Sequence, residues 1–377
     1  MDNRRTLKPV RQGWASLPVL VLLLLLPRTA SADIINVPGD FSTIQAALDA
    51  ALDDDEIAVA PGTYFEAINL LGKSLTLRST DGAEVTTIDG TGTNSSVVKC
   101  ISGEDRDTVI DGFTVTGGTG TDFGGGTVGG GILISNSDPY VTNCSFVNNH
   151  VALGGGGMAT VNSKAVVVKC RFRLNTSKSG GGGLFNFGGA RPTLAHCLFV
   201  ENSATFGGGG MLNNGADAFL ANCVFHANSP LQIWLVAGSN ATILNCIVWG
   251  NPASSIVLDE STATVMYSDI ETGFTGTGNI VADPLFVDAD NLDLRLSPNS
   301  PCIDAGISLA PEFDLDGHAR VLDDPATGDT GVGFPAVIDM GAYEFGSSPP
   351  CPADFDGDRD VRASDLAQLL GSWGPCP

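Results

Sequence analysis

The chain has few basic residues for its length and few charged residues of any kind. It contains 19 Lys and Arg against 42 Asp and Glu, which gives a formal net charge of −23 at pH 7. A chain with this excess of negative charge repels nucleic acid and anionic membranes, so neither is an expected partner. Only 16% of the residues are charged and 43% are hydrophobic, which argues against disorder.

Long apolar runs are absent after the first 32 residues, and those residues are typical of a secretory signal peptide. A basic start precedes an apolar run over Leu17–Leu26, and Ala-Ser-Ala at 30–32 is a cleavage signature. The run is short for a membrane span, and an uncleaved anchor is the alternative interpretation. Its leucine content favours the general secretory route over a twin-arginine signal. We therefore expect a soluble, secreted or cell-surface protein that begins near Asp33 with 14 basic and 41 acidic residues.

One pattern recurs at intervals of 23 to 27 residues through the middle of the chain. Each repeat has a cysteine, an apolar residue two positions later and an asparagine five positions later. Glycine runs begin ten positions after the first three cysteines, at Gly154, Gly180 and Gly207. The cysteines are Cys144, Cys170, Cys197, Cys223 and Cys246, the apolar residues are Phe146, Phe172, Phe199, Phe225 and Val248, and the asparagines are Asn149, Asn175, Asn202, Asn228 and Asn251.

This repeat predicts an all-β solenoid of parallel strands, a parallel β-helix, over residues 57–282 with about nine turns. Residues two apart in a strand lie on one face, so the cysteines and phenylalanines are expected to form interior ladders. The asparagines are expected just after the strand, in the left-handed conformation of a tight bend and bonded to their stacked copies. The glycine runs indicate close backbone packing and exclude a helical or leucine-rich repeat. They are not a phosphate loop, because no Gly-Lys-Ser/Thr follows them.

A short helix is expected to cap the first turn within residues 33–56, because a solenoid needs its ends covered. Ser42 and Gln45 have the spacing of a capping box. The acidic run 53–56 is interpreted as a solvated turn. The apolar stripe of the expected helix consists of Ile44, Ala47, Leu48 and Ala51.

Two segments, Phe41–Ala47 and Ile57–Tyr64, resemble the opening of pectin-lyase-like right-handed parallel β-helix proteins. Pectin methylesterases share this opening, and the Asn-Cys-x-Phe repeats resemble the same superfamily. The resemblance implies a right-handed helix. It is weak for activity, because the polygalacturonase and pectin methylesterase motifs and the Asp-rich calcium cluster of pectate lyases are missing from the sequence.

Residues 283–346 are similar to the choice-of-anchor Q module that ends many bacterial secreted β-helices. The similarity lies in Asp283–Phe286, Leu294–Pro298, Ser300–Gly306 and Asp339–Glu344. It implies a structural module that seals the C-terminal end of the solenoid and precedes an anchoring device. A buried charge network around Arg320 is expected there rather than a functional site. The acidic candidates for that network are Asp314, Asp316, Asp339 and Glu344.

After a linker at 347–350, residues 351–377 carry acids at positions 1, 3, 5, 7 and 12 of a loop. Ca²⁺ requires oxygen ligands at this spacing, and a solvated acidic loop is the alternative. The loop resembles half of a dockerin, which implies a scaffold or surface docking partner, but Arg359 replaces the expected glycine and a second loop is missing. A disulfide between Cys351 and Cys376 would stabilise so small a module. The candidate ligands are Asp354, Asp356, Asp358, Asp360 and Asp365.

Asp and Glu are also missing between residues 139 and 200, where six basic residues lie. Lys169 and Arg171 flank a repeat cysteine, so they should point outward when the cysteine points inward. Arg173 follows on the same strand, and His196 takes the place of Lys169 one turn later. These four residues predict a basic face that binds a carboxylated or sulfated glycan, with solubilising charge as the alternative.

The missing carboxylates argue against a glycoside hydrolase, which normally uses a pair of them. A polysaccharide lyase that uses Lys169 or Arg171 as its base needs none and is the enzymatic alternative. The cysteine ladder is interpreted as buried thiols, some of which can pair by oxidation, and not as a metal site. We therefore expect a monomeric protein that binds extracellular polysaccharide or serves as a structural or adhesive surface protein.

Overall fold

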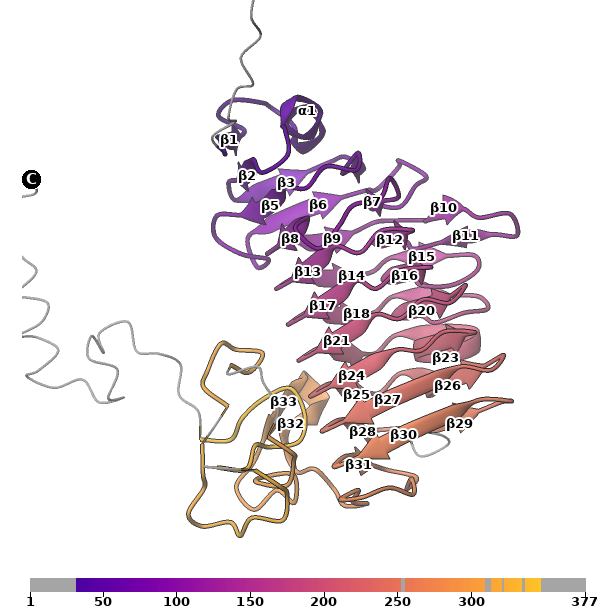
Figure 1. The fold of residues 1–377 in the computed structure, drawn as a ribbon, viewed down its shortest axis with the longest axis vertical. Coiled ribbons are helices and arrows are strands. Elements are labelled where there is room, and N and C mark those ends of the chain that lie inside the picture. The colour runs from indigo at the N-terminus through magenta and orange to yellow at the C-terminus, as the bar shows by residue number, and fades with distance from the viewer. Residues whose placement is uncertain (1–31, 252–254, 309–312, 321, 334–335, 347–377) are drawn as a thin grey trace, which may run out of the picture. The chain divides into compact units, whose positions relative to one another are not determined.

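The computed structural model describes residues 32–251, 255–308, 313–320, 322–333 and 336–346. In these residues the chain forms the expected right-handed parallel β-helix, in which three long sheets follow one another around each turn (Figure 1). Each strand pairs in parallel with the equivalent strand of the next turn, so that Phe146 lies beside Phe172 and Phe172 beside Phe199.

The strands of the solenoid belong to three sheets, named here in the order in which the repeats visit them. The first sheet contains β1 (Ile34–Val37), β2 (Glu56–Val59), β5 (Thr76–Ser79), β8 (Val109–Asp111), β13 (Tyr140–Thr142), β17 (Val166–Val168), β21 (Thr193–Ala195), β24 (Phe219–Ala221), β27 (Asn240–Leu244) and β30 (Thr262–Met266). The second sheet contains β3 (Gly62–Tyr64), β6 (Thr86–Asp89), β9 (Thr114–Thr116), β14 (Ser145–Val147), β18 (Arg171–Arg173), β22 (Leu198–Val200), β25 (Val224–His226), β28 (Ile247–Trp249) and β31 (Asp269–Ile270). The third sheet contains β4 (Ile68–Asn69), β7 (Val98–Cys100), β12 (Ile132–Ser135), β15 (His150–Val151), β16 (Met158–Val161), β19 (Thr176–Ser177), β20 (Leu184–Phe187), β23 (Ser203–Asn214), β26 (Ser229–Val236) and β29 (Ile256–Leu258).

The remaining described elements are short. They are α1 (Ile44–Ala50), the 3₁₀ helix η1 (Ala289–Asn291) and the antiparallel pairs β10 (Thr121–Asp122) with β11 (Thr127–Val128) and β32 (Phe286–Asp288) with β33 (Asp293–Leu296). Neither helix in this described part of the chain is long and apolar enough to cross a membrane.

Ladders of like side chains fill the interior of the solenoid. Phe146, Phe172, Phe199 and Phe225 are buried and stacked, with ring centroids 5.0, 4.6 and 4.5 Å apart. Burying each phenylalanine contributes about 2–3 kcal/mol to stability. The repeat cysteines are buried beside these rings, and every cysteine among the described residues is a free thiol. The ladders follow the register that the sequence repeat predicts.

The repeat asparagines form a second interior ladder. Oδ1 of Asn175, Asn202 and Asn228 each accepts from the backbone N and from Nδ2 of the preceding asparagine, at 2.9–3.1 Å. The left-handed conformation expected at these asparagines occurs one residue earlier, with φ of 55° at Asn148 and 54° at Leu174. The bend is complete before the asparagine, which is why its amide points inward to its neighbours.

The glycine runs lie where neighbouring turns approach closely, as expected. A Cβ placed on Gly156 would lie 2.6 Å from the carbonyl oxygen of Gly182. One placed on Gly183 would lie 2.7 Å from the carbonyl oxygen of Gly210. Any larger residue would push the turns apart, because these contacts are to backbone and cannot yield by side-chain rotation.

The helix α1 covers the first turn with its apolar stripe buried, but its cap differs from the expected box of Ser42 and Gln45. Thr43 is the N-cap residue, and its hydroxyl accepts from a first-turn amide at 3.2 Å. The carboxylate of Glu66 accepts from the backbone N of Ile44 and of Gln45 at 2.8 and 2.9 Å. A carboxylate at a helix N-terminus satisfies amides that have no intrahelical partner. Glu66 lies in the next loop, more than 20 residues from the start of α1, so a local capping motif does not include it.

The first turn also begins earlier than expected. The strand β1 lies inside the segment 33–56 and pairs with β2, so the solenoid starts at Ile34 and not at Ile57. The acidic run 53–56 is only partly a solvated turn. Asp55 is buried and accepts from the backbone N of Asp33 at 3.0 Å and of Leu52 at 2.7 Å.

Residues 283–346 form β32, η1, β33 and irregular segments with a small core, called the end module below. This core includes the outward side chains of Leu198, Val224 and Ile247 from three consecutive strands of the second sheet. Asn245 adds two hydrogen bonds to the backbone of Ile307, at 2.8 and 2.9 Å. The end module therefore packs along the side of several turns.

Candidate functional site

Lys169 and His196 lie at the bend between the first and second sheets, in the left-handed conformation with φ of 55° and 52°. The end module covers this bend. Lys169 is partly buried, with Nζ 5.8 Å from the ring centre of Phe313. Burial lowers the pKa of Lys169, although Asp314 and Asp316 act in the opposite direction. The lysine therefore faces the end module.

Arg171 and Arg173, on β18, are held in ion pairs. Arg171 Nη2 lies 3.6 Å from Asp316 Oδ1, and the same aspartate accepts from Arg295 at 2.6 Å. Arg173 pairs with Glu201 at 3.0 Å. Asp316 and Glu201, two carboxylates from outside the stretch between residues 139 and 200, thus pair with two of its six basic residues. This arrangement replaces the open basic face that the sequence predicts.

His196 is fully buried, which corrects its expected place on an outward face. Its Nδ1 lies 3.3 Å from Arg320 Nη1, so Nδ1 accepts and the ring proton is on Nε2. Burial, followed by the charges of Arg320 and Lys169, lowers the pKa of His196 to about 2. The ring is therefore neutral at physiological pH and offers no charge to a glycan.

Arg320 forms the buried network that the sequence predicts. Its Nη1 and Nη2 donate to the carbonyl oxygens of Gly341 and Asp339 at 2.9 and 2.6 Å, and its Nε lies 3.6 Å from Glu344 Oε2. Burial and repulsion from Asp339 raise the pKa of Glu344 to about 9 in spite of the guanidinium. Burial also raises the pKa of Asp339 to about 7. The network is closed to solvent and joins the end module to the solenoid.

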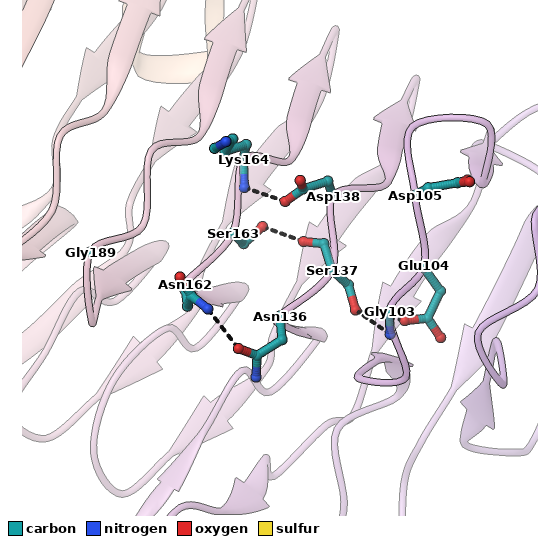
Figure 2. Close-up of a pocket in the computed structure, with 10 residues that line it drawn as sticks. All are labelled: Gly103, Glu104, Asp105, Asn136, Ser137, Asp138, Asn162, Ser163, Lys164 and Gly189. Atoms are coloured by element: carbon teal, nitrogen blue, oxygen red, sulfur yellow. Dashed lines mark hydrogen bonds between the residues drawn. The ribbon is translucent and has the colours of Figure 1, made fainter.

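An open groove lies elsewhere, at the bends that join the third sheet to the first (Figure 2). It encloses about 340 Å³ and is lined by residues 103–105, 136–138, 162–164 and Gly189. These segments are the same bend in four consecutive turns. With about 4.8 Å per turn, the groove extends about 14 Å along the solenoid.

Two asparagines occupy equivalent positions in the groove. Asn136 and Asn162 are both exposed, and Nδ2 of Asn162 donates to Oδ1 of Asn136 at 2.7 Å (Figure 2). Their φ angles are 52° and 46°, in the left-handed region that asparagine tolerates better than most residues. Each amide retains donors or acceptors for a ligand, because one bond uses only part of its capacity.

The floor of the groove is rigid. Ser137 Oγ donates to Glu104 Oε2 at 2.7 Å, and Glu104 also accepts from the backbone N of Gly72 and of Ser102, each at 2.9 Å. Ser163 Oγ donates to the carbonyl oxygen of Ser137 at 2.6 Å. Glu104 is buried and engaged by three donors, so it supports the floor and is not placed to transfer a proton to a ligand.

Charges of both signs line the rim. Asp105, Arg106 and Lys164 are exposed, and Asp138 is partly exposed. Asp138 Oδ1 accepts from the backbone N of Lys164 at 2.6 Å. Arg106 spans two turns, with Nη2 donating to the carbonyl oxygen of Lys164 at 2.6 Å. The rim thus offers donors and acceptors side by side, which suits hydroxyl groups better than a polyanion.

An aromatic cluster lies on the third sheet, close along the chain to the groove residue Gly189. Phe187 ends β20, two residues before Gly189, and its ring stacks on Phe185 at 4.6 Å. Phe123, which is 41% exposed, contacts Phe187 edge-to-face at 5.3 Å. Apolar ring surface beside polar groups is the usual composition of a small-molecule site.

The sequence contains a second, shorter repeat at the groove, which is less evident than the repeat of cysteines. Asn136-Ser137 and Asn162-Ser163 are 26 residues apart, in the register of Cys144 and Cys170. Glycine replaces the asparagine in the next turn, at Gly189. The pair alone does not indicate a groove, because the depth depends on loops from turns that share no motif.

Several sequence predictions fall outside the described residues. They are the signal peptide at 1–32 except its last residue, the linker 347–350, the calcium ligands Asp354, Asp356, Asp358, Asp360 and Asp365, and the disulfide between Cys351 and Cys376.

The chain has a low similarity to several solved structures. A pectate lyase, Pel9A, is 14% identical, with 84% of this chain and 97% of that chain covered and a TM-score of 0.47. A pectin methylesterase from Aspergillus niger is 17% identical, with 63% and 87% covered and a TM-score of 0.37. A pectin methylesterase in complex with a hexasaccharide is 12% identical, with 72% and 94% covered and a TM-score of 0.41. A search of curated proteins gives no match.

A family model described as a right handed beta helix region matches residues 173–281. This segment begins at the last residue of β18 (Arg171–Arg173) and extends past β31. Its strands stack in parallel in all three sheets. The family match and the strand pairing agree on one fold, a right-handed parallel β-helix.

Proposed function

We propose that the protein binds extracellular polysaccharide in the groove at residues 103–105, 136–138, 162–164 and Gly189, without cleaving it. The observation that carries this proposal is the repetition of exposed amides along consecutive turns, with Asn136 beside Asn162, on a floor held by hydrogen bonds. A linear site with a repeat along the solenoid axis suits a polymer better than a compact metabolite.

The groove favours a neutral chain. Asp105 and Asp138 stand on its rim, and the whole chain carries a net charge of −23, so a polyanion would be repelled. Amide, carboxylate and ammonium groups together can donate to and accept from sugar hydroxyls. Phe123 and Phe187 add apolar surface against which the face of a sugar ring can pack.

The double variant N136A/N162A is expected to bind the preferred polysaccharide about tenfold to thirtyfold more weakly than the parent. Two lost hydrogen bonds of about 1 kcal/mol each account for this factor. Affinity electrophoresis of the purified protein in gels containing neutral or acidic polysaccharides measures the change.

The matched control is N240A/T262A, which removes an exposed hydrogen bond of 3.2 Å between neighbouring turns beyond Gly189, at residues that do not line the groove. It should migrate as the parent does in every gel. Equal weakening by both variants would show that binding is not located in the groove. Retention on acidic polysaccharides alone would contradict the proposed neutral ligand.

A polysaccharide lyase is the second candidate function, and Lys169 and Arg171 are its candidate catalytic bases. The end module covers Lys169, and Arg171 is paired with Asp316. The same polysaccharide panel should therefore give neither new reducing ends nor the ultraviolet absorbance of unsaturated uronates. Either product would overturn the proposal of binding without cleavage.

We also propose that the acidic loop at 354–365 binds one Ca²⁺ and serves to attach the protein to a scaffold or surface. Support comes from the spacing of its five aspartates, which matches the ligand positions of a calcium loop. The variant D354N/D356N should bind one Ca²⁺ fewer than the parent in equilibrium dialysis at pH 7.5. An unchanged number of bound ions would contradict a calcium loop in this segment.

A further inference from the structure

We propose that the end module contains a Ca²⁺ site formed by Asp304, Asp323 and Asp329. Its ligands are different residues from those that line the groove and from the aspartates of the loop at 354–365. Its three ligands come from two segments, the turn around Asp304 and the loop 322–330. A bound ion would join these segments.

The geometry fits one cation. One carboxylate oxygen of each aspartate lies within 4.8 Å of one oxygen of each of the other two. Ca²⁺ binds oxygen at about 2.3–2.6 Å, so two ligands on opposite sides of one ion are about 5 Å apart. Asp323 and Asp329 are exposed, which leaves coordination positions for water. The donor set contains only carboxylate oxygens, which suit a hard cation and not Zn²⁺.

A second observation concerns Asp304 alone. Its side chain is fully buried, and among the described residues its Oδ1 has no hydrogen-bond partner. Its Oδ2 accepts from the backbone N of Asp324 at 3.2 Å. A buried carboxylate oxygen without a partner is destabilising unless a proton or a cation satisfies it. The two neighbouring carboxylates make a cation the better partner at neutral pH.

The electrostatics of Asp304 agree with this assignment. Burial is the main effect that raises the pKa of Asp304 to about 6, and the charges of Asp323, Asp329 and Asp324 add to it. The backbone hydrogen bond from Asp324 acts in the opposite direction. Ionised Asp304 is thus disfavoured in the calcium-free protein, and Ca²⁺ would reverse the sign of these interactions.

The backbone already holds both segments in place for the ion. Asp304 lies in the left-handed region with φ of 49°, and its N donates to Asp339 Oδ1 at 2.8 Å. Its carbonyl oxygen accepts from the backbone N of Thr330 and of Gly331 at 3.0 and 3.1 Å. Little ordering remains to be done on binding, so the ligands are preorganised.

The first test compares D323N/D329N with D259N/E260Q in the full chain. Both variants remove two exposed negative charges, but Asp259 and Glu260 lie on a turn of the third sheet. In equilibrium dialysis against CaCl₂ at pH 7.5, D323N/D329N should bind one Ca²⁺ fewer than the parent. D259N/E260Q should bind the parental number.

This comparison does not depend on the loop at 354–365. If that loop binds no ion, D323N/D329N should still lose one equivalent relative to the parent. Equal numbers of bound Ca²⁺ in D323N/D329N and the parent would overturn the site. Loss of one equivalent in both variants would also overturn it, because the effect would then follow net charge.

The second test uses D304N and thermal unfolding. Removing the buried carboxylate should raise the Tm of the calcium-free protein at pH 7.5. Added Ca²⁺ should raise the Tm of D304N by less than it raises the Tm of the parent, and by as little as it raises the Tm of D323N/D329N. In the parent this increase should be larger at pH 7.5 than at pH 5, because protons compete with Ca²⁺ for carboxylate oxygens. A calcium effect in D304N equal to that of the parent would overturn the assignment of Asp304 as a ligand.

Discussion

Replacing Arg320 with methionine is expected to lower the free energy of unfolding of the end module by about 3–5 kcal/mol at pH 7.5. The guanidinium is fully buried and bridges the solenoid and the end module, through His196 on one side and the carbonyl oxygens of Gly341 and Asp339 on the other. Methionine fills part of the volume, but it donates to neither carbonyl oxygen and places no positive charge beside Glu344.

Chemical denaturation followed by tryptophan fluorescence measures this loss, since Trp249 packs against the core of the end module. The loss should be smaller at pH 5, where Asp339, whose pKa is raised to about 7, is protonated and needs no positive charge beside it. A loss independent of pH would show that the guanidinium acts only by its shape and not by its charge.

The control variant for this prediction is E344Q. Because the pKa of Glu344 is raised to about 9, its carboxyl is protonated at neutral pH and glutamine is a close replacement. The change at pH 7 should be under about 1 kcal/mol. In the parent, the raised pKa gives stability that is complete below about 4.5 and is lost as pH rises toward 9. E344Q should flatten this slope; a loss at pH 7 as large as that of R320M would instead show an ionised Glu344.

Replacing Asn202 with alanine is expected to cost about 4 kcal/mol or more. Asn202 Oδ1 accepts two hydrogen bonds from Asn175, and its Nδ2 donates to the carbonyl oxygen of Phe172 and to Asn228 Oδ1. Alanine would remove these four buried hydrogen bonds, which contribute about 1 kcal/mol each. Asn175 Nδ2 would keep its bond to the carbonyl oxygen of Phe146, and Asn228 Oδ1 would keep its bond from the backbone N of residue 202. Urea unfolding followed by circular dichroism at 218 nm measures the change.

The comparison is with Asn251→Ala, at the far end of the same column. Asn251 is partly exposed, and its Nδ2 donates to the carbonyl oxygens of Asn228 and Pro230. Water can replace these bonds, so we expect a loss of about 1 kcal/mol. Similar losses of unfolding free energy in the two variants would contradict this prediction. They would mean that burial does not increase the stability that the asparagine hydrogen bonds contribute.

The same ladder shows how far the repeat could be interpreted before the structure was known. The period, the inward cysteines and phenylalanines and the stacking of the asparagines are all properties of one turn repeated on itself. The position of such a residue depends only on its place in its own strand and on the equivalent residue one turn away. The period of the sequence is therefore sufficient to predict which residues face the interior. The residue in the left-handed conformation lies one position before the predicted asparagine. Asparagine favours both a bend and an inward ladder, and the sequence does not show which of the two it forms.

The errors lie where one element meets another that is distant in sequence. The cap of α1 uses Glu66 from the next loop, and no local box contains it. His196 and Arg320 are 124 residues apart in sequence and 3.3 Å apart in space. No pattern within residues 139–200 indicates that Asp316 of the end module would pair with Arg171 or that Phe313 would lie beside Lys169.

The sequence by itself therefore determined the solenoid, its register and its interior ladders, because each turn is packed against a near copy of itself. Tertiary structure alone decided which outward surfaces stay open. The end module closed the basic face at Lys169 and His196, while the bends at Asn136 and Asn162 remained a groove. Exposure depends on contacts between segments that share no repeat, and these contacts are fixed only when the whole chain is folded.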